Sequence, residues 1–325
     1  MLGAETTARA NVNVALVKYW GKRDPSLNLP ATGSISLTLE GLGVEATCVF
    51  GVESDRCTID GDAAVGPDAD RVLRFVDLVR SEARIEARAR VVTTSSVPKG
   101  VGLASSAAAF ASLAVAVSRA AGLRLEAPAL SALARRGSGS AARSIYGGFV
   151  EWHRGERADG RDSIAEPLLA PGDWDVRMVV AVTSTARKAV SSSDGMRRAA
   201  TSPLYPAWVE TAERDLAEAR RAIAARDLDA VGQVAEHSAL KMHAIGLAAR
   251  PPLLYWRGAT VECIHRIWAL RAEGIHGYVT IDAGPQVKVL CEPDDASRIA
   301  DALRDVPGVE RVLACTPGSG AEVRA

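Results

Sequence analysis

The segment from residue 85 to residue 122 constrains the fold most, because three local patterns follow one another in it. Apolar and charged side chains alternate over residues 85–91, and this period of two predicts a strand with one buried face. A turn with two glycines follows at 98–106, and an Ala-rich run then continues to Ala121 before Gly122. Serines before such a run and a glycine after it are typical of a helix. We therefore expect a strand, a glycine turn and a helix in direct succession.

Strand and helix patterns are mixed along the rest of the chain. Apolar and β-branched runs predict strands at 11–20, 34–39, 46–50, 57–59, 176–182, 278–281 and 287–290. Helical spacing predicts helices at 127–136, at 208–223 and after Leu228, and the polar stretch 153–173 is expected to be a surface loop near the junction of two halves. Because strict strand–helix alternation is missing, we predict an α+β fold. A length of 325 residues is typical of about two domains.

The charge balance limits the classes of partner. The chain has 39 Lys and Arg residues against 39 Asp and Glu residues, so its formal net charge is zero. This balance argues against a nucleic-acid or membrane surface and favours a small molecule or a second copy of the chain as partner. Five cysteines without a CxxC pair predict reduced thiols and a cytoplasmic location. Five histidines without an HExxH pattern make a protein-built zinc site unexpected, and no metal ligands are assigned.

The glycine turn is the first candidate binding site. Gly100 and Gly102 precede Ser105 and Ser106 at the predicted helix start, where backbone N–H groups and the helix dipole favour phosphate. The turn is not a Walker A loop, since no Gly-Lys-Ser/Thr follows. A helix that is merely capped by serine remains the alternative.

A second candidate site combines small residues and cations. GSGSAARS, starting at residue 137, imitates a dinucleotide fingerprint, but it follows a predicted helix instead of a strand, which excludes that function. The segment still offers the hydroxyls of Ser138 and Ser140 and the planar guanidinium of Arg143, which suits a carboxylate or phosphate. Lys18 and Lys22 would attract an anion at the end of the first strand. The alternatives are that the GSGSAARS segment is only a helix end with a surface arginine, and that the two lysines are a solvated surface pair.

Two further positions carry polar groups at element ends. Asp282 follows a predicted strand, where it is either a carboxylate held on a rigid element or a turn former. Three serines at 191–193 either receive phosphate oxygens or cap the next helix. His237 and His243 are interpreted as structural.

These segments, in this order, resemble the superfamily of galactokinase, homoserine kinase, mevalonate kinase and phosphomevalonate kinase, and within it the diphosphomevalonate decarboxylases. The resemblance rests on NVALVKYWGKRD from residue 13, PKGVGLASSAA from 98, RRGSGSAARSIYGGFVEW from 135, SSSDGM from 191 and TIDAGP from 280. It implies a half of the ribosomal S5 domain 2 type and a ferredoxin-like half, with the site between them. We place the division at residues 1–187 and 188–325. The resemblance also implies ATP, Mg²⁺ and a homodimer.

The implied reaction is ATP-dependent decarboxylation of mevalonate 5-diphosphate to isopentenyl diphosphate, through phosphorylation of the 3-hydroxyl and loss of phosphate and CO₂. By resemblance, the catalytic residues are Asp282, Lys18 and Arg143. The implied substrate-binding residues are Asn13, Tyr19, Lys22, Ser138, Ser140, Arg143, Ser192 and Ser193. The implied ATP-binding residues are Gly100, Gly102, Leu103, Ala104, Ser105 and Ser106.

One departure from the resemblance concerns the group at C5 of the substrate. Some relatives place a basic residue at the position of Ser193, whereas this loop carries acidic Asp194 and no base. Asp194 would repel a diphosphate unless it points outward or meets a cation. Mevalonate 5-phosphate therefore stays open as a second candidate substrate. Two further functions also stay open, a mevalonate-type kinase that does not decarboxylate and a ligand sensor without turnover.

Overall fold

The computed structural model of the chain describes residues 3–97, 105–186 and 188–324, and its strands form two large sheets and a small hairpin. The strands of the first sheet are β1 (Thr6–Val17), β4 (Ser34–Val52), β5 (Arg56–Ile59), β6 (Asp62–Ala63), β7 (Arg88–Ser95), β8 (Phe149–Trp152), β9 (Ala165–Leu169) and β14 (Glu322–Arg324). They pair in the order β14-β1-β4-β7-β5-β6, with β8 attached to β4 and β9 attached to β8. The second sheet holds β10 (Arg177–Val182), β11 (Gly277–Ile281), β12 (Val287–Cys291) and β13 (Arg311–Cys315) in the order β11-β12-β10-β13. The hairpin pairs β2 (Lys22–Asp24) with β3 (Leu29–Pro30).

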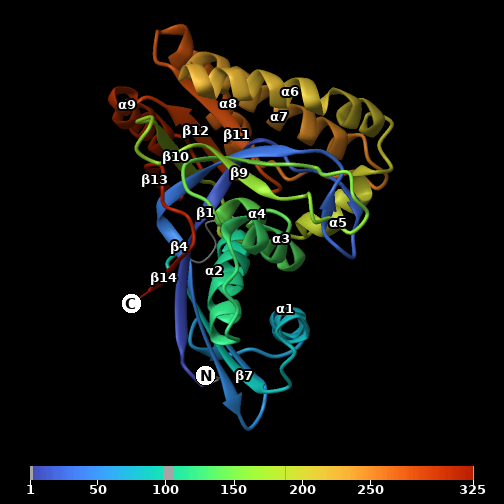
Figure 1. Cartoon of the computed structure of the whole chain (residues 1–325). Helices are drawn as coiled ribbons and strands as arrows, with labels where there is room; N and C mark the ends of the chain where they lie inside the picture. Colours follow the sequence, from blue (N-terminus) through green and yellow to red (C-terminus); the bar gives the residue numbers. More distant parts are fainter. Residues whose placement is uncertain (1–2, 98–104, 187, 325) are drawn as a thin grey trace.

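The helices divide between the two sheets. The helices that precede the second sheet in the chain are α1 (Pro67–Ala83), α2 (Ser105–Ala120), α3 (Ala127–Gly137) and α4 (Ala141–Ser144). The later helices are α5 (Ser192–Ala199), α6 (Tyr205–Ala225), α7 (Leu228–Leu247), α8 (Gly258–Ala272) and α9 (Pro293–Arg304). Figure 1 shows α6, α7 and α8 at the end of the molecule opposite α1 and β7. Within the described ranges, none of the helices has the length and apolar character needed to cross a membrane.

The structure confirms the predicted α+β class and, on either side of residues 98–104, the predicted strand and helix. The glycine turn predicted between them lies outside the described residues, and β7 begins three residues later than the alternation at 85. The strands expected at 34–39 and 46–50 form one 19-residue strand, β4, which runs through Gly41 and Gly43. The prediction of a loop throughout 153–173 is wrong, since β9 lies within it and pairs with β8.

Three strands of the second sheet, β10, β11 and β12, are buried on both faces, which explains their continuous apolar runs. Met178 and Val180 of β10 join a core cluster that also contains Val14 and Leu37 of the first sheet. Val179, the residue between them, belongs to a cluster with residues of α8 and α9 instead. One face of the second sheet therefore packs toward the first sheet, and the other face packs under α8 and α9. Helix α7 joins the two sheets, because it packs on both β1 and β11.

Two strands pair across the predicted division at residue 187. β10 precedes this division, yet its partners are β12 and β13. β14 follows it and pairs with β1. The segment just before β14 also hydrogen bonds to the first sheet. Gly318 N donates to Thr38 O over 2.8 Å, and Gly318 O accepts from Gly148 N over 3.0 Å. The division into residues 1–187 and 188–325 stays a prediction.

Candidate active site

A cleft with a volume of about 260 Å³ collects polar side chains from many elements. Its lining comes from β1 and the segment after it, from α1, α2, the α3–α4 segment, α5 and α7, and from the turn after β11. The lining includes most of the residues that the sequence singled out: Asn13, Lys18, Tyr19, Lys22, Ser106, Ser138, Ser140, Arg143, Ser192, Ser193 and Asp282. Residues nearly 270 positions apart in the sequence therefore share one cavity, as Asn13 and Asp282 do.

An ion pair between Lys18 and Asp282 lies where one strand of each sheet ends. Lys18 is the first residue after β1, and Asp282 is the first residue after β11. Lys18 Nζ donates to Asp282 Oδ1 over 2.7 Å and to the carbonyl oxygen of Ala15 over 2.8 Å. The backbone of Lys18 is held as well, because its N–H donates to Ser238 Oγ of α7 over 3.0 Å. Rigid elements on three sides thus fix the pair.

The charges around this pair keep the carboxylate ionised. Burial alone would raise the pKa of Asp282, but the charges and hydrogen bonds of Lys18 and Lys288 outweigh it and hold that pKa well below its usual range. Burial lowers the pKa of Lys18 to about 8, although Asp282 opposes the shift. An anion with so low a pKa is a weak proton acceptor. The arrangement therefore favours Asp282 as a group that orients a hydroxyl through a hydrogen bond.

Arg143 presents a buried guanidinium with an unused N–H group. It belongs to the short helix α4, and its Nη groups donate to Ser34 Oγ and, over 3.0 Å, to Asn13 Oδ1. Its Nε has no hydrogen-bond partner among the described residues, although it is buried. Burial lowers the pKa of Arg143 to about 10, so it stays charged at neutral pH. A fixed, charged fork with a free donor suits a carboxylate ligand.

Tyr19 and Gly139 form one wall of the cleft. The Tyr19 hydroxyl is buried and has no partner among the residues that the structure describes. Burial raises the pKa of this phenol well above its usual range, so it remains a hydrogen-bond donor. A Cβ at residue 139 would lie 2.7 Å from the Tyr19 hydroxyl oxygen, so the close approach requires glycine there. Ser140 adds its backbone oxygen, which accepts from Asn13 Nδ2 over 3.1 Å.

A second pair of cations lies at another part of the cleft. Lys22 Nζ donates to Asn28 Oδ1 over 2.6 Å, and Arg71 of α1 lines the same cavity. Burial lowers the pKa of Lys22, and the charge of Arg71 lowers it further. The hydroxyls of Ser106 and Ser138 lie beside each other at 3.5 Å. Two cations and two hydroxyls make this part of the cleft suitable for phosphate oxygens.

The serine loop caps a helix and also reaches the cleft. Ser191 is the N-cap of α5 and accepts from Asp194 N over 3.1 Å, as the capping alternative predicted. Ser192 and Ser193 line the cleft, whereas Asp194 does not. The Asp194 carboxylate instead pairs with Arg197 and accepts from Ser191 Oγ over 2.8 Å. Asp194 therefore meets a cation outside the lining of the cleft, which is the condition under which its carboxylate would not repel a diphosphate.

Two protein-family models match successive parts of this chain. Residues 10–165 match the diphosphomevalonate decarboxylase-like N-terminal domain, and residues 178–317 match the mevalonate 5-diphosphate decarboxylase C-terminal domain. Human diphosphomevalonate decarboxylase is 35% identical over 324 residues, which cover 92% of this chain and 80% of the human protein. The chain belongs to the diphosphomevalonate decarboxylase family.

Solved structures of decarboxylases in this family share the whole fold. Mevalonate diphosphate decarboxylase from Staphylococcus aureus is 36% identical with a TM-score of 0.94, over 100% of this chain and 99% of that one. The enzyme from Enterococcus faecalis is 36% identical with a TM-score of 0.91, over 98% of both chains. The resemblance to the diphosphomevalonate decarboxylases and the two-part fold that it implies are thereby confirmed.

Part of the predicted ATP-binding loop of this decarboxylase lies outside the described residues. Gly100, Gly102, Leu103 and Ala104 fall in the gap at 98–104. Ser105 and Ser106 begin α2, and of the two it is Ser106 that lines the cleft. The N-terminus of this 16-residue helix has no acidic residue in its first turn, which suits a phosphate.

Sequence reasoning missed several residues of the site, and three of them carry a charge or fix a charged group. Arg71 was missed because no helix was predicted at α1, although the apolar positions Val72, Phe75, Val76 and Val79 carry helical spacing that could have found it. Ser34 was assigned only to a strand. Lys288 donates to Asp282 Oδ2 over 3.0 Å but lies within a run that was predicted only as a strand.

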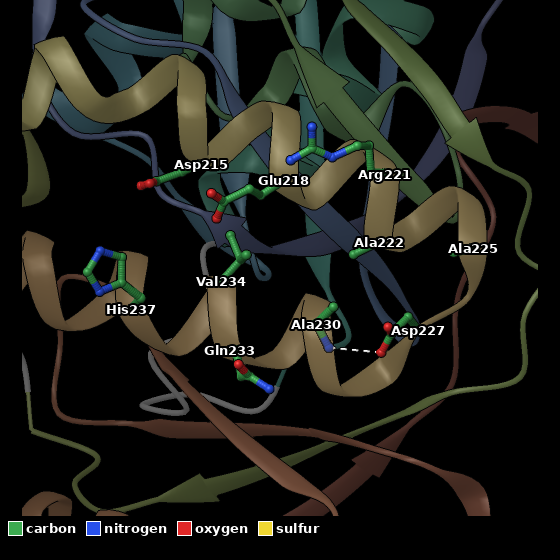
Figure 2. Close-up of a pocket in the computed structure, with 10 residues that line it drawn as sticks. All are labelled: Asp215, Glu218, Arg221, Ala222, Ala225, Asp227, Ala230, Gln233, Val234 and His237. Carbon is green, nitrogen blue, oxygen red and sulfur yellow. Dashed lines mark hydrogen bonds between the residues drawn. The ribbon is translucent and has the colours of Figure 1, made fainter.

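A larger cavity of about 570 Å³ lies away from these residues, between α6 and α7 (Figure 2). Asp215, Glu218 and Arg221 line it from α6, and Gln233 and His237 line it from α7. It contains none of the predicted catalytic or substrate-binding residues. His243 lies elsewhere and is buried, and among the described residues no group of three or more His, Cys, Asp and Glu side chains could hold a metal.

Proposed function

We propose that this decarboxylase converts mevalonate 5-diphosphate and ATP into isopentenyl diphosphate, ADP, phosphate and CO₂. The observation that carries the proposal is the joint position of the Lys18–Asp282 pair and Arg143 in the lining of one cleft. A similar solved structure, 37% identical with a TM-score of 0.92 over 98% of both chains, is a complex with MVAPP, AMPPCP and magnesium. A decarboxylase needs a group that orients the hydroxyl and a group that holds the carboxylate, and the cleft offers both.

Asp282 acts on the 3-hydroxyl in the proposed first step. Transfer of a phosphoryl group passes through a loose transition state and depends on positioning and charge neutralisation more than on a strong base. A carboxylate held ionised by two ammonium groups can accept a hydrogen bond from the hydroxyl and so direct its oxygen. Lys18, beside it, neutralises negative charge on the group in transit. Mg²⁺ bound with ATP supplies further neutralisation of phosphate charge, and Ser105 and Ser106 are the described residues proposed to bind ATP.

Arg143 acts in the proposed second step. A planar guanidinium that is fixed by Ser34 and Asn13 can hold the substrate carboxylate in one orientation until CO₂ leaves. Loss of phosphate from C3 develops positive charge at that carbon. The nearby Asp282 carboxylate stabilises this charge electrostatically. We propose that Asn13, Tyr19, Ser138 and Ser140 complete the binding wall.

The group at C5 is proposed to bind at the Lys22 side of the cleft, together with Ser192 and Ser193. Lys22 and Arg71 provide two positive charges there, and the Asp194 carboxylate is engaged by Arg197 outside the lining. This arrangement favours a diphosphate over the 5-monophosphate alternative.

We also propose a homodimer and a cytoplasmic location. The homodimer follows from the resemblance, and light scattering should give twice the 34.1 kDa of the chain. The location is supported by the five cysteines, all of which are free and buried. A monomer mass at micromolar concentration would refute the first of these proposals.

Paired measurement of ADP and CO₂ tests the reaction. Purified protein with Mg-ATP receives mevalonate 5-diphosphate or the 5-monophosphate in separate assays. Equal ADP and CO₂ with the diphosphate support the proposal. The same stoichiometry with the monophosphate alone would assign the alternative substrate, and ADP without CO₂ on either compound would refute decarboxylation.

A further inference from the structure

Lys288 is a buried cation in the middle of an apolar strand. Its neighbours on β12, Val287, Val289 and Leu290, are fully buried, and Lys288 itself is only 1% exposed. β12 is a central strand with β11 on one side and β10 on the other. An ammonium group at such a position carries a large desolvation cost, whereas an apolar side chain would fill it without that cost. The charge is therefore expected to have a use other than packing.

The ammonium group of Lys288 is directed at the carboxylate of the proposed active site. Lys288 Nζ donates to Asp282 Oδ2 over 3.0 Å, while Lys18 Nζ donates to Oδ1 over 2.7 Å. Each carboxylate oxygen thus has an ammonium group of its own. Lys18 and Asp282 line the cleft, but Lys288 is not part of the lining, so it approaches the carboxylate from behind.

The strand register supports this contact from the same face of the sheet. Lys288 is paired with Thr280 on β11, two residues before Asp282. Thr280 Oγ1 donates to the Ala15 carbonyl oxygen over 3.2 Å, and the same oxygen accepts from Lys18 Nζ. The hairpin that carries Asp282 and Lys288 is therefore tied directly to the end of β1.

We propose that Lys288 is a positioning residue for Asp282. By holding Oδ2, it prevents rotation of the carboxylate plane and keeps Oδ1 turned, with Lys18, toward the bound 3-hydroxyl. The proposal rests on the proposed function, because it assigns Lys288 to the same reaction. A carboxylate held by Lys18 alone would retain its charge but could rotate about its terminal torsion, which is broad and weakly constrained.

Lys288 also contributes to the charge balance of the pair. Among the residues that the structure describes, the other charged or titratable groups that face the pair are Arg143 on α4, His243 on α7 and Lys188 before α5. Burial lowers the pKa of His243 to about 4, so it is neutral at neutral pH. The charge of Lys288 is one of the causes that lower the pKa of Lys18. Removal of that charge should therefore move the loss of the Lys18 proton to higher pH.

The test compares Lys288→Met with Val289→Ala in the full-length chain. Methionine matches the length of lysine without its charge, and Val289 lies on the same strand but packs toward α8 and α9. For Lys288→Met we expect kcat to fall about 10- to 100-fold, as for a misplaced reacting group, with KM within about threefold of wild type. The alkaline limb of its pH–rate profile should move to higher pH. Val289→Ala should lower Tm but leave kcat and the limb unchanged.

A second variant keeps the test decisive if Lys288→Met does not fold. Lys288→Gln retains a donor without the charge, so it should show the shifted alkaline limb with a smaller loss of kcat. Wild-type kcat and an unshifted limb in whichever variant folds would overturn the proposal, as would a change in Tm alone. If the wild-type chain itself releases no CO₂, the proposed function fails instead, so the two failures are distinguishable.

Discussion

Replacing Asp282 with asparagine should damage both turnover and stability, and the two losses have different causes. The variant keeps the shape of the side chain but leaves two ammonium groups, at 2.7 and 3.0 Å, without their counter-ion. Both lysine side chains are 1% exposed and the Asp282 side chain is 30% exposed. Removing one partner of a fully buried pair costs about 3–5 kcal/mol, and partial exposure of the carboxylate places this case near 3 kcal/mol. For a chain of this length that is a loss of about 4 °C in Tm.

The stability loss should depend on pH in a defined direction. Without Asp282, the folded-state pKa of Lys18 falls further below its unfolded value of about 10.4. The unfolded state then binds more protons than the folded state, so the variant gains stability as pH rises. The gap between wild type and variant should be widest near pH 6 and narrow toward pH 9. Chemical denaturation at several pH values measures this gap.

Turnover should fall by at least about 10³-fold at every pH, because a positioned electrostatic group is lost. Asp215→Asn is the matched control, since the buried Asp215 carboxylate pairs with Lys241 at 2.5 Å and lies outside the cleft, where Asp215 lines the cavity of Figure 2. The control should lose stability but keep turnover within about threefold, as expected for a change that leaves the cleft intact. Near-normal turnover in Asp282→Asn, or an equal loss in the control, would refute the role given to the carboxylate.

Three further predictions concern the same cleft. Arg143→Lys should lower kcat by about 100-fold despite the retained charge, because a point charge cannot replace the fork that reaches Ser34 and Asn13; wild-type steady-state kinetics would contradict this. In wild type, kcat/KM should fall as pH rises through about 8, since the Lys18 ammonium is lost there, and a flat profile from pH 6.5 to 9.5 would exclude that group. Asp194→Asn should leave the preference for diphosphate over monophosphate within about threefold, because its carboxylate pairs with Arg197 away from the cleft; a larger change in the ratio of kcat/KM values would show contact with the substrate.

The sequence was sufficient to predict those site residues that local turn and cap preferences mark. The glycines and serines at 137–140 and the aspartate after β11 each stand at the end of an element, where turn and cap preferences mark them. Lys288 could not be found in this way, because a lysine between valines in a strand usually points to solvent. Its burial depends on the first sheet and α7 covering that face, which is a property of the tertiary fold.

Boundaries between elements were predicted less well for a related reason. The strands predicted at 34–39 and 46–50 were expected to be separate, yet β4 runs through both because the single strand β1 pairs with both stretches, at 35–38 and again at 43–48. The stretch 153–173 is polar and looks like a loop, but β8 provides a partner for β9 within it. In both places pairing with a distant strand outweighs local preference.

The pairing of β14 with β1 imposes an order on synthesis and folding. Asn11 Nδ2 donates to Ser319 O over 3.1 Å, and Ala321 N donates to Ile145 O over 3.2 Å, so residues 318–321 support the wall that holds Asn13 and Arg143. Roughly 300 residues separate β1 from β14, and a ribosome adds about 5–20 residues per second. One edge of β1 therefore stays without its partner for about 15–60 s in every nascent chain, a period in which an open edge can pair with another chain.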